Sequence, residues 1–592
     1  MRMKKLLFLL FIFTSLVIYG QNDFMLAENY YREGAYKKAA EMYKILFQKN
    51  PNNTTYLKRL VTSYQETSQF ETAKALLTNQ LSKNPHQQYL NVELGYNYEK
   101  QYQQDTAKVY YEKAINAIEK QPNFGGYIGR LFKLNNQLDY AILAYKKTMK
   151  FNKKVNYNFQ IAQIYGEKGA FEKMFQSYVN LVDQQENYLK TVQRFTNKYI
   201  TEDPLNKNNI LFKKILIKKS VGNPKNSWNQ LLSWLFIQQK EYEKAFVQQK
   251  ALFKRNPKYL SSIIDLGHIS FEGKAFETAK QCFDFVLKNS LFLEEKLNAL
   301  LFNIKIDIAT KQNAIDASFE EVFKTFGKTK VTLPFQIEYA DYLTFQKNQP
   351  AKATTILLDA LKISTSKFQK AKLKLKLGDI SVFTGNFNKG LIYFSQVQTS
   401  IKNHPLAQEA RFKVAQTSYF KNDFKWAMSQ LKVLKASTTQ LIANDALALF
   451  LIISDNQSKD SLPSGLKLYA KADLLTYQNK NKQAADSLQI ILTKFKGQKI
   501  EDEAFFKQSS LFIKMKLFDK AIANYTKIIA LNKEGILVDD ALYQLAELYK
   551  NKLNNSEKAS EYYQKIIFEH PSSIYLVEAR KKFRKLRGDI IQ

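Results

Sequence analysis

The side chains that most often carry chemistry are sparse in this sequence. It contains four histidines and one cysteine among 592 residues. A zinc site needs three or four such ligands at short spacings, as in an H-E-x-x-H helix or a cluster of Cys and His. The histidines stand singly and far apart, at His86, His268, His404 and His570. The sequence therefore predicts no metal site.

Nucleotide-binding and nucleophile motifs are absent as well. The chain has no G-x-x-x-x-G-K-[ST] phosphate loop, and Gly125, Gly126 and Gly129 are expected on a helix and not after a strand. It has no G-x-S-x-G elbow for a serine nucleophile. Cys282 stands beside Phe283 in an apolar stretch, which favours burial over reactivity. A Ser-His-Asp site assembled from distant residues stays open, but the sequence favours a non-enzymatic protein without cofactors.

The charge balance is strongly basic. Lys and Arg number 89 against 54 Asp and Glu, a formal net charge of +35. Such a surface attracts polyanions. A polyanion-binding protein, with lipopolysaccharide, anionic lipid or nucleic acid as ligand, is therefore one functional hypothesis. The alternative is a lysine-rich solvated surface without a specific ligand.

The first twenty residues have the pattern of an export signal. Three basic residues within the first five precede an apolar run over 6–18 and then Gly20. The run is shorter than the roughly 20 residues that span a bilayer. We predict that residues 1–20 are a signal peptide, and that the mature chain has no transmembrane segment and lies in a periplasm or on the periplasmic face of an outer membrane. An uncleaved anchor is the alternative, and a nucleic-acid partner is disfavoured outside the cytosol.

A small residue recurs along the chain at a fixed interval. Each of these residues has an aromatic or aliphatic neighbour three or four positions away, which is the spacing of one helix face. The interval of 34 residues separates Ala39, Ala73, Ala107 and Ala141, and it separates Ala245 from Ala279 and Pro51 from Pro85. A small side chain at this position lets a second helix approach closely.

Each 34-residue interval predicts a pair of helices. In one unit, the first helix carries Leu94-Gly95 and Tyr98, and the second carries Ala107 and Tyr111. A glycine often stands between the two helices, where a helix end needs a positive φ; Gly34, Gly169 and Gly385 are examples. One hairpin cannot bury both of its apolar faces, so successive hairpins are expected to stack.

These residues resemble the tetratricopeptide repeat family, whose 34-residue unit has a Leu-Gly/Ala…Tyr helix, an Ala…Tyr/Phe…Ala helix and a closing Pro. Weaker units are centred on Met174, Ala353, Gly390, Ala427, Ala484, Ala521 and Ala559. The resemblance implies an all-α fold, a right-handed superhelical solenoid of about 12–14 antiparallel hairpins.

Two stretches, about 185–225 and 291–335, interrupt the repeat. We predict an N-terminal solenoid over 22–290, an irregular helical connector over 291–335, and a C-terminal solenoid over 336–592 that ends in a basic capping helix. Degenerate hairpins that continue a single stack are the alternative.

The resemblance implies that the protein binds other proteins. It would act as a scaffold or adaptor that holds a peptide or helix in its concave groove. Groove positions flank the buried residues of each first helix, and the candidates are Glu28, Lys58, Thr62, Tyr89, Tyr96 and Arg130. The segments from His404 and His570 are similar to repeats of outer-membrane assembly proteins and Tol–Pal coordinators, which suggests envelope components as partners.

Overall fold

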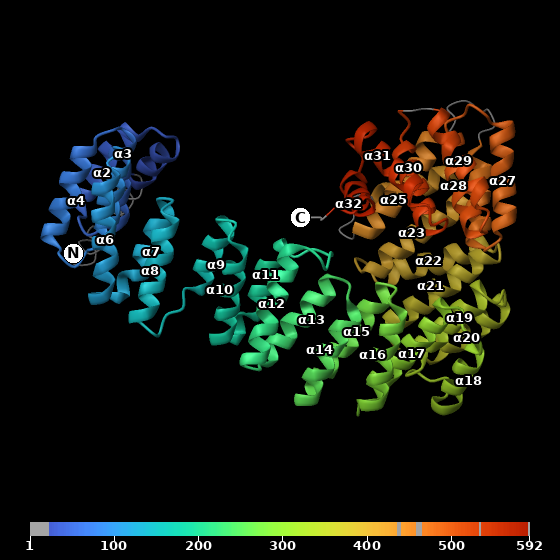
Figure 1. Ribbon diagram of the computed structural model, residues 1–592. Coiled ribbons are helices and arrows are strands. Elements are labelled where there is room, and N and C mark those ends of the chain that lie inside the picture. Colours follow the sequence, from blue (N-terminus) through green and yellow to red (C-terminus); the bar gives the residue numbers. More distant parts are fainter. Residues whose placement is uncertain (1–22, 435–439, 457–464, 532–533, 590–592) are drawn as a thin grey trace, which may run out of the picture. The chain divides into compact units, whose positions relative to one another are not determined.

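Every regular element in the described part of the chain is helical (Figure 1). The computed structural model describes residues 23–434, 440–456, 465–531 and 534–589. Their contacts group into two compact units, Met1–Gln239 and Lys240–Gln592. The predicted all-α class is therefore confirmed. The predicted signal peptide, residues 1–20, lies outside the described residues.

Unit 1 begins with a helix over residues 23–32. It continues with α2 Tyr36–Lys49, α3 Thr54–Glu66, α4 Phe70–Lys83, α5 Leu90–Glu99, α6 Gln104–Lys120, α7 Gly125–Leu134, α8 Leu138–Phe151, α9 Asn158–Glu167, α10 Phe171–Gln184, α11 Leu189–Thr196, α12 Lys207–Gly222 and α13 Asn226–Gln238. Single 3-10 turns precede α7 and flank α11, at Pro122–Phe124, Glu186–Tyr188 and Asn197–Tyr199.

Unit 2 holds the remaining helices, with one 3-10 turn at Pro257–Tyr259. They are α14 Tyr242–Arg255, α15 Leu260–Glu272, α16 Phe276–Asn289, α17 Leu293–Ala309, α18 Ile315–Phe326, α19 Leu333–Phe345, α20 Pro350–Ile363, α21 Lys367–Phe383, α22 Phe387–Ser400, α23 Pro405–Phe420, α24 Phe424–Leu434, α25 Gln440–Asn456, α26 Leu466–Tyr477, α27 Asn481–Lys494, α28 Ile500–Lys514, α29 Phe518–Leu531, α30 Val538–Asn551, α31 Ser556–Glu569 and α32 Leu576–Arg587. None of the helices searched in the described ranges combines the length and apolarity needed to cross a bilayer.

The recurring small residues lie where two helices of a hairpin meet. All six repeat alanines from Ala39 to Ala279 are buried. On the first helix, a glycine contacts an aromatic ring that stands 16 residues later on the second helix. A Cβ added at Gly95 would come within 2.4 Å of the Tyr111 ring. The same contact recurs as Gly129 with Tyr145, Gly267 with Phe283, and Gly378 with Phe394. The hairpin therefore closes over a glycine that leaves room for a ring.

The turn within each of the first five hairpins places one residue in the left-handed region. Gly34 has φ of +75°, and the residues 34, 68 and 102 positions later have φ of 59°, 62° and 58°. These residues are Ser68, Tyr102 and Asn136. The glycine at position 34 marked its turn in the sequence. The next three turns have the same left-handed backbone conformation but no glycine, so their sequences did not mark them.

We expect Tyr102→Gly to stabilise unit 1 by about 1 kcal/mol, since glycine relieves the left-handed strain. The Tyr102 side chain is 92% exposed, so little packing is lost. Urea unfolding followed by circular dichroism measures the change. The control Lys108→Gly, at an exposed right-handed position inside α6, is expected to destabilise by about 1 kcal/mol. A loss of stability in both variants contradicts the assignment of strain to Tyr102.

The two stretches without the repeat pattern are also helical. Residues 185–225 form α11, α12 and the flanking 3-10 turns. Residues 291–335 form α17, α18 and the start of α19, and α17 packs against both α16 and α19. Residues 291–335 are thus built of regular helices that belong to unit 2, which begins at Lys240. The division into two solenoids joined by a connector stays a prediction.

Ion pairs join the first helices of neighbouring hairpins at nearly the repeat interval. In each pair, a lysine amino group lies 2.5–3.1 Å from a carboxylate 33–35 residues away in sequence. The pairs are Glu66–Lys100, Lys133–Glu167, Lys305–Glu338, Asp341–Lys376, Asp379–Lys413, Asp473–Lys507 and Glu547–Lys582. A charge on one first helix is therefore usually neutralised by the next hairpin.

Unit 2 departs from nearest-neighbour stacking at the end of α26. The Gln478 side chain donates to the carbonyl of Phe383 at 2.8 Å, and the Asn479 side chain donates to the carbonyl of Phe345 at 2.7 Å. The Tyr477 hydroxyl donates to the carbonyl of Asp379 at 3.3 Å. These bonds join residues about 95–134 positions apart in sequence. The end of α26 therefore contacts hairpins of unit 2 that are not its neighbours in the stack.

Candidate functional site: a cationic pocket on the first helices of unit 1

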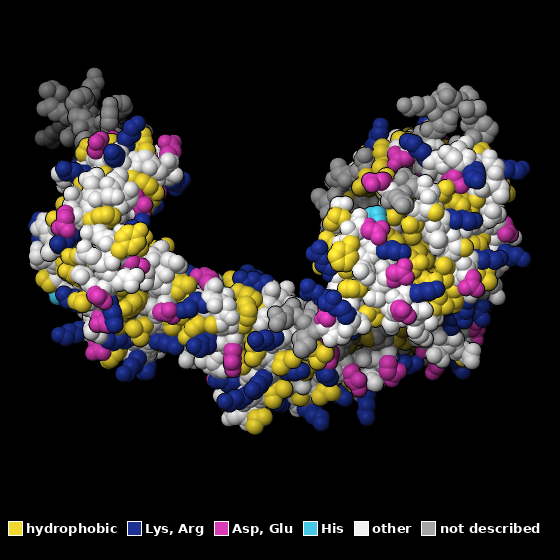
Figure 2. All heavy atoms as spheres, turned by 45° about the horizontal axis from the view of Figure 1, so that its top comes forward, with side chains coloured by type: hydrophobic (Ala, Val, Ile, Leu, Met, Phe, Trp, Pro, Cys, Tyr) yellow, Lys and Arg dark blue, Asp and Glu magenta, His cyan; other side chains and the backbone are white. Residues whose placement is uncertain are grey.

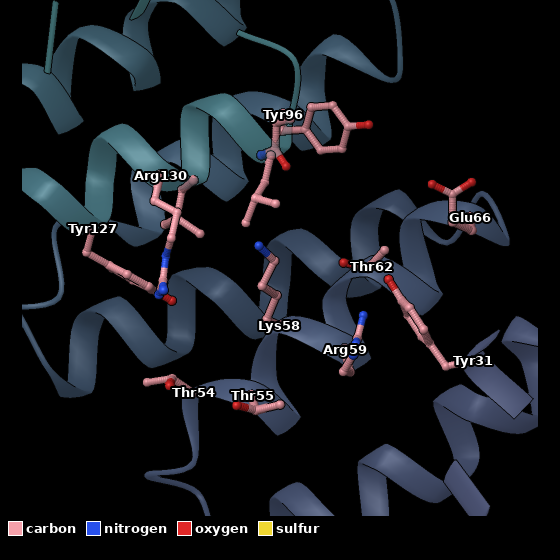
Figure 3. Close-up of a pocket in the computed structure, with 13 residues that line it drawn as sticks. Tyr31, Thr54, Thr55, Lys58, Arg59, Thr62, Glu66, Tyr96, Tyr127 and Arg130 are labelled. Atoms are coloured by element: carbon pink, nitrogen blue, oxygen red, sulfur yellow. The ribbon is translucent and has the colours of Figure 1, made fainter. Parts of the chain in front are cut away.

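A pocket of about 500 Å³ lies on α3, α5 and α7, with Tyr31 of the helix over 23–32 at its side, so the first helices of four successive hairpins line it (Figure 3). This volume is in the range of ligand-binding clefts. Side chains of unit 1 line it: Tyr31, Thr54, Thr55, Lys58, Arg59, Thr62, Glu66, Tyr96, Tyr127, Arg130, Leu131, Leu134 and Asn135. The lining thus combines three cations with tyrosine rings and threonine hydroxyls.

The structure brings four of the six predicted groove residues together in this pocket. They are Lys58, Thr62, Tyr96 and Arg130. Glu28 does not line the pocket, but its carboxylate holds Arg59, which does. Tyr89 is buried beneath it and packs edge-on against the Tyr127 ring, with 4.9 Å between ring centres.

Arg59 is fixed at one side of the pocket by a small network. Its guanidinium donates to Glu28 Oε1 at 2.7 Å, and the Tyr43 hydroxyl donates to Glu28 Oε2 at 2.5 Å. The guanidinium also lies 4.0 Å from the centre of the Tyr31 ring. Burial would raise the pKa of Glu28, but the Tyr43 hydrogen bond and the Arg59 charge hold it below its ordinary value. Arg59 is therefore neutralised within the protein.

Lys58 and Arg130 are different, because in the described structure neither has a carboxylate within 4.0 Å. The Arg130 guanidinium lies 4.9 Å from the centre of the Tyr127 ring. Burial lowers the pKa of the Lys58 amino group, the charge of Glu93 opposes this, and the charge of Arg130 lowers the pKa further. The two cations thus repel each other across the pocket, and an anionic ligand between them would relieve the repulsion.

Glu93 occupies the place of the missing ion-pair partner. It stands on α5, 35 residues after Lys58, but it is buried and its Oε1 has no hydrogen-bond partner. Burial raises the pKa of Glu93, although the Lys58 charge opposes this rise. Glu93 lines a narrow cavity under the pocket together with Lys58 and Tyr127. The buried Glu93 therefore offsets the charge of Lys58 only in part.

We expect Glu93→Gln to raise the affinity for an acidic peptide about three- to tenfold at neutral pH, since it removes a competing negative charge. In the wild-type chain, Glu93 becomes neutral as the pH falls through its raised pKa. Affinity should therefore rise as the pH falls from neutral toward the usual range of the peptide carboxylates. Isothermal titration calorimetry across this range tests the prediction. A Glu93→Gln variant with unchanged affinity, or with the wild-type pH dependence, contradicts it.

Unit 2 has a pocket of similar volume, about 490 Å³, on α23, α25, α26 and α28. Its central acid, Asp473, accepts a hydrogen bond from the Tyr419 hydroxyl at 2.9 Å. The Lys507 amino group lies 2.8 Å from the other Asp473 oxygen. Because the central charges of this pocket already compensate each other, the unit 1 pocket is the stronger candidate for a charged ligand.

His404, His268 and Cys282 lie at a helix cap or in buried surroundings. His404 accepts a hydrogen bond from the backbone N–H of Leu406 and so caps α23. Burial lowers the pKa of His268, whose ring centre lies 4.3 Å from that of Phe302. Burial raises the pKa of the Cys282 thiol to about 12. Within the described ranges, no three His, Cys, Asp or Glu side chains are placed to hold a metal ion.

The excess of basic residues is not confined to the pocket. In Figure 2, Lys and Arg side chains are spread over the visible faces of both units and are interspersed with acidic and apolar ones. The net charge of +35 therefore gives a general attraction for anions, while the specific feature of the pocket is the pair of cations without carboxylate partners.

Two segments of the chain match a known family model. The tetratricopeptide repeat model matches residues 21–53 and 540–573. The second segment coincides with the α30–α31 hairpin. None of the curated proteins matches the sequence significantly.

Several solved structures align with most of the chain, but their TM-scores are low. Naa15/Naa10 bound to HypK-THB has 13% identity and a TM-score of 0.28, over 96% of this chain and 97% of the other. The APC/C hetero-tetramer Cut9-Hcn1 has 12% identity and a TM-score of 0.25, over 97% and 98%. The P58(IPK) TPR domain has 14% identity and a TM-score of 0.18, over 68% and 98%. The described residues form an all-helical assembly of stacked hairpins, and residues 21–53 and 540–573 of the chain match the tetratricopeptide repeat.

Proposed function

We propose that this protein is a non-enzymatic scaffold or adaptor that binds acidic segments of partner proteins in the pocket on α3, α5 and α7. Stacked helical hairpins act in general by presenting an extended surface to other proteins. The observation that carries the proposal is the pair Lys58 and Arg130, two cations that line one pocket without carboxylate partners. Carboxylates of an acidic peptide are the complement of such a pair.

The shape and lining of the pocket favour a peptide over a free small anion. Four first helices supply the lining, the helix over 23–32 together with α3, α5 and α7, so a bound segment can run across successive hairpins. Tyr31, Tyr96 and Tyr127 offer rings for packing against peptide side chains and hydroxyls for hydrogen bonds. We propose that carboxylates of the partner contact Lys58 and Arg130 while its other side chains pack on these rings.

We further propose that the chain is exported and acts in a bacterial cell envelope, in the periplasm or on the periplasmic face of the outer membrane. The basic start, the apolar run over 6–18 and Gly20 support this proposal. The resemblance of the segments from His404 and His570 to outer-membrane assembly and Tol–Pal coordinator repeats adds envelope components as the class of partner. Cell fractionation with N-terminal sequencing tests the export step. Recovery of an unprocessed chain from the cytosol contradicts it.

Photo-crosslinking in the native cells tests the binding function. A photoreactive amino acid in place of Thr62, which lines the pocket, is expected to capture a discrete protein partner. The same group in place of Lys108, an exposed residue of the second helix α6, is the matched control. Adding Lys58→Glu and Arg130→Glu to the Thr62 variant should abolish capture. Equal capture from both positions, or capture that survives the charge reversal, contradicts the proposal.

A further inference from the structure

The helix α12 presents an apolar surface to solvent. It lies in the stretch 185–225 that lacks the repeat pattern. One of its faces is buried in unit 1 through Phe212, Ile215 and Leu216. The opposite face carries an apolar stripe, which consists of Ile210, Ile217 and Val221, exposed by 42%, 47% and 80%. Leu205, just before the helix, is 76% exposed. A helix that is apolar on two faces normally has a covering partner on each.

This stripe distinguishes α12 from the other second helices of unit 1. Among the large apolar residues, α2 exposes Ile45, α6 exposes Val109, and α8 exposes Leu143 and Phe151. The helices α4 and α10 expose none. At 100° per residue, the three stripe residues of α12 fall within about 40° of one another. They therefore form one continuous line along the helix.

Lysines border the apolar stripe. A lysine stripe, Lys207, Lys214 and Lys218, follows it on one side, and all three residues are exposed. Lys213 borders the other side and is partly exposed. A fifth lysine, Lys219, is held by Asp183 at 2.6 Å. The helix contains no Asp or Glu, so the charge on the helix itself is entirely positive, and the nearest acids in sequence, Glu202 and Asp203, precede it beside Leu205.

We infer that this face of α12 docks on an anionic lipid surface. An interfacial helix places apolar side chains at the boundary between headgroups and acyl chains, and its lysines reach the phosphates beside them. The juxtaposed apolar and lysine stripes have this arrangement. A nucleic acid would complement the lysines but would leave Ile210, Ile217 and Val221 in water, and an acidic protein surface has no acyl layer to receive them. The site is separate from the pocket on α3, α5 and α7.

Co-sedimentation of the purified chain with lipid vesicles tests the inference. Vesicles of phosphatidylglycerol and phosphatidylcholine in equal parts are expected to bind at least about tenfold more strongly than phosphatidylcholine alone. The triple variant Ile210→Ser, Ile217→Ser, Val221→Ser and the double variant Lys214→Glu, Lys218→Glu should each weaken binding to the anionic vesicles about tenfold. Because all five side chains are exposed or partly so, the circular dichroism spectrum should stay unchanged.

Two controls separate this surface from general charge attraction. Lys108→Glu with Lys113→Glu makes the same change of charge on α6, where both lysines are exposed, and should change vesicle binding less than about twofold. Binding to duplex DNA should be insensitive to the triple serine variant. The inference is overturned if the serine variant binds anionic vesicles as well as wild type, or if the α6 variant loses as much affinity as the α12 variant.

Discussion

Reversing both pocket cations, Lys58→Glu with Arg130→Glu, is expected to weaken the binding of an acidic peptide at least about 100-fold. In the wild-type chain, the ligand carboxylates meet two cations that form no ion pair within the described protein, and the buried Glu93 charge offsets Lys58 only in part. In the variant, the same positions repel them, and like-charge contacts at a partly buried site cost several kcal/mol. Fluorescence anisotropy of a labelled peptide of about ten residues, rich in Glu and Asp, measures the change.

The matched control for this variant is Lys108→Glu with Lys113→Glu on the second helix α6. It makes the same change in net charge at exposed positions away from the pocket lining. We expect its affinity to fall less than about threefold, because exposed charges are screened beyond about 10 Å at ordinary ionic strength. Equal losses in the two variants would show that the peptide responds to net charge and not to the pocket.

The second large effect concerns the hairpin itself. Gly95→Ala should destabilise unit 1 by about 2 kcal/mol, although alanine favours helices over glycine by about 1 kcal/mol. The added Cβ would lie 2.4 Å from the Tyr111 ring and 3.0 Å from the Ala107 carbonyl oxygen. Because the ring is packed and the carbonyl belongs to the helix backbone, the two helices must separate. Hydrogen exchange of the α5 and α6 amides in the full chain measures the loss.

Gly222→Ala is the control for this substitution. Gly222 ends α12, and a Cβ there would meet nothing within 4 Å. The same chemical change should therefore be neutral or slightly stabilising, by up to about 1 kcal/mol. If Gly95→Ala is as benign as Gly222→Ala, then the glycine–aromatic contact does not set the distance between the two helices of a hairpin.

The spacing of small residues was enough to predict the hairpins. Ala39, Ala73 and Ala107 recur at 34 residues because each must admit a second helix, and a buried contact of this kind restricts residue type. The turns were less visible. Positive φ recurs at Ser68 and Tyr102, two residue types that do not favour it. The surrounding hairpin imposes the conformation on them.

The repeat pattern did not predict how the helices outside the pattern pack. Residues 291–335 lack the alanine spacing, yet α17 packs against α16 and α19 as part of unit 2. Likewise, the bonds from Gln478 and Asn479 to carbonyl groups about 95–134 residues away depend on how hairpins wind in space. A one-dimensional pattern encodes contacts between neighbours, whereas these contacts join hairpins far apart in sequence.

The candidate pocket was partly predictable. Lys58, Thr62, Tyr96 and Arg130 line it because groove positions on a first helix follow from helix periodicity. Arg59 and Glu93 were missed. Glu93 lies 35 residues after Lys58, close to the interval of the ion pairs between first helices, so the repeat interval applied to charged residues would have found it. That its carboxylate is buried, with Oε1 lacking a hydrogen-bond partner, required the structure.

Mapping where an acidic peptide attaches tests the account most directly. A peptide that carries one photoreactive side chain is bound to the purified chain and crosslinked, and its attachment points are then located by mass spectrometry. We predict attachment to residues of α3, α5 and α7, and loss of attachment in the Lys58→Glu, Arg130→Glu variant. Attachment concentrated on the second helices α4, α6 and α8, or within unit 2, would contradict the assignment of the pocket as the partner-binding site.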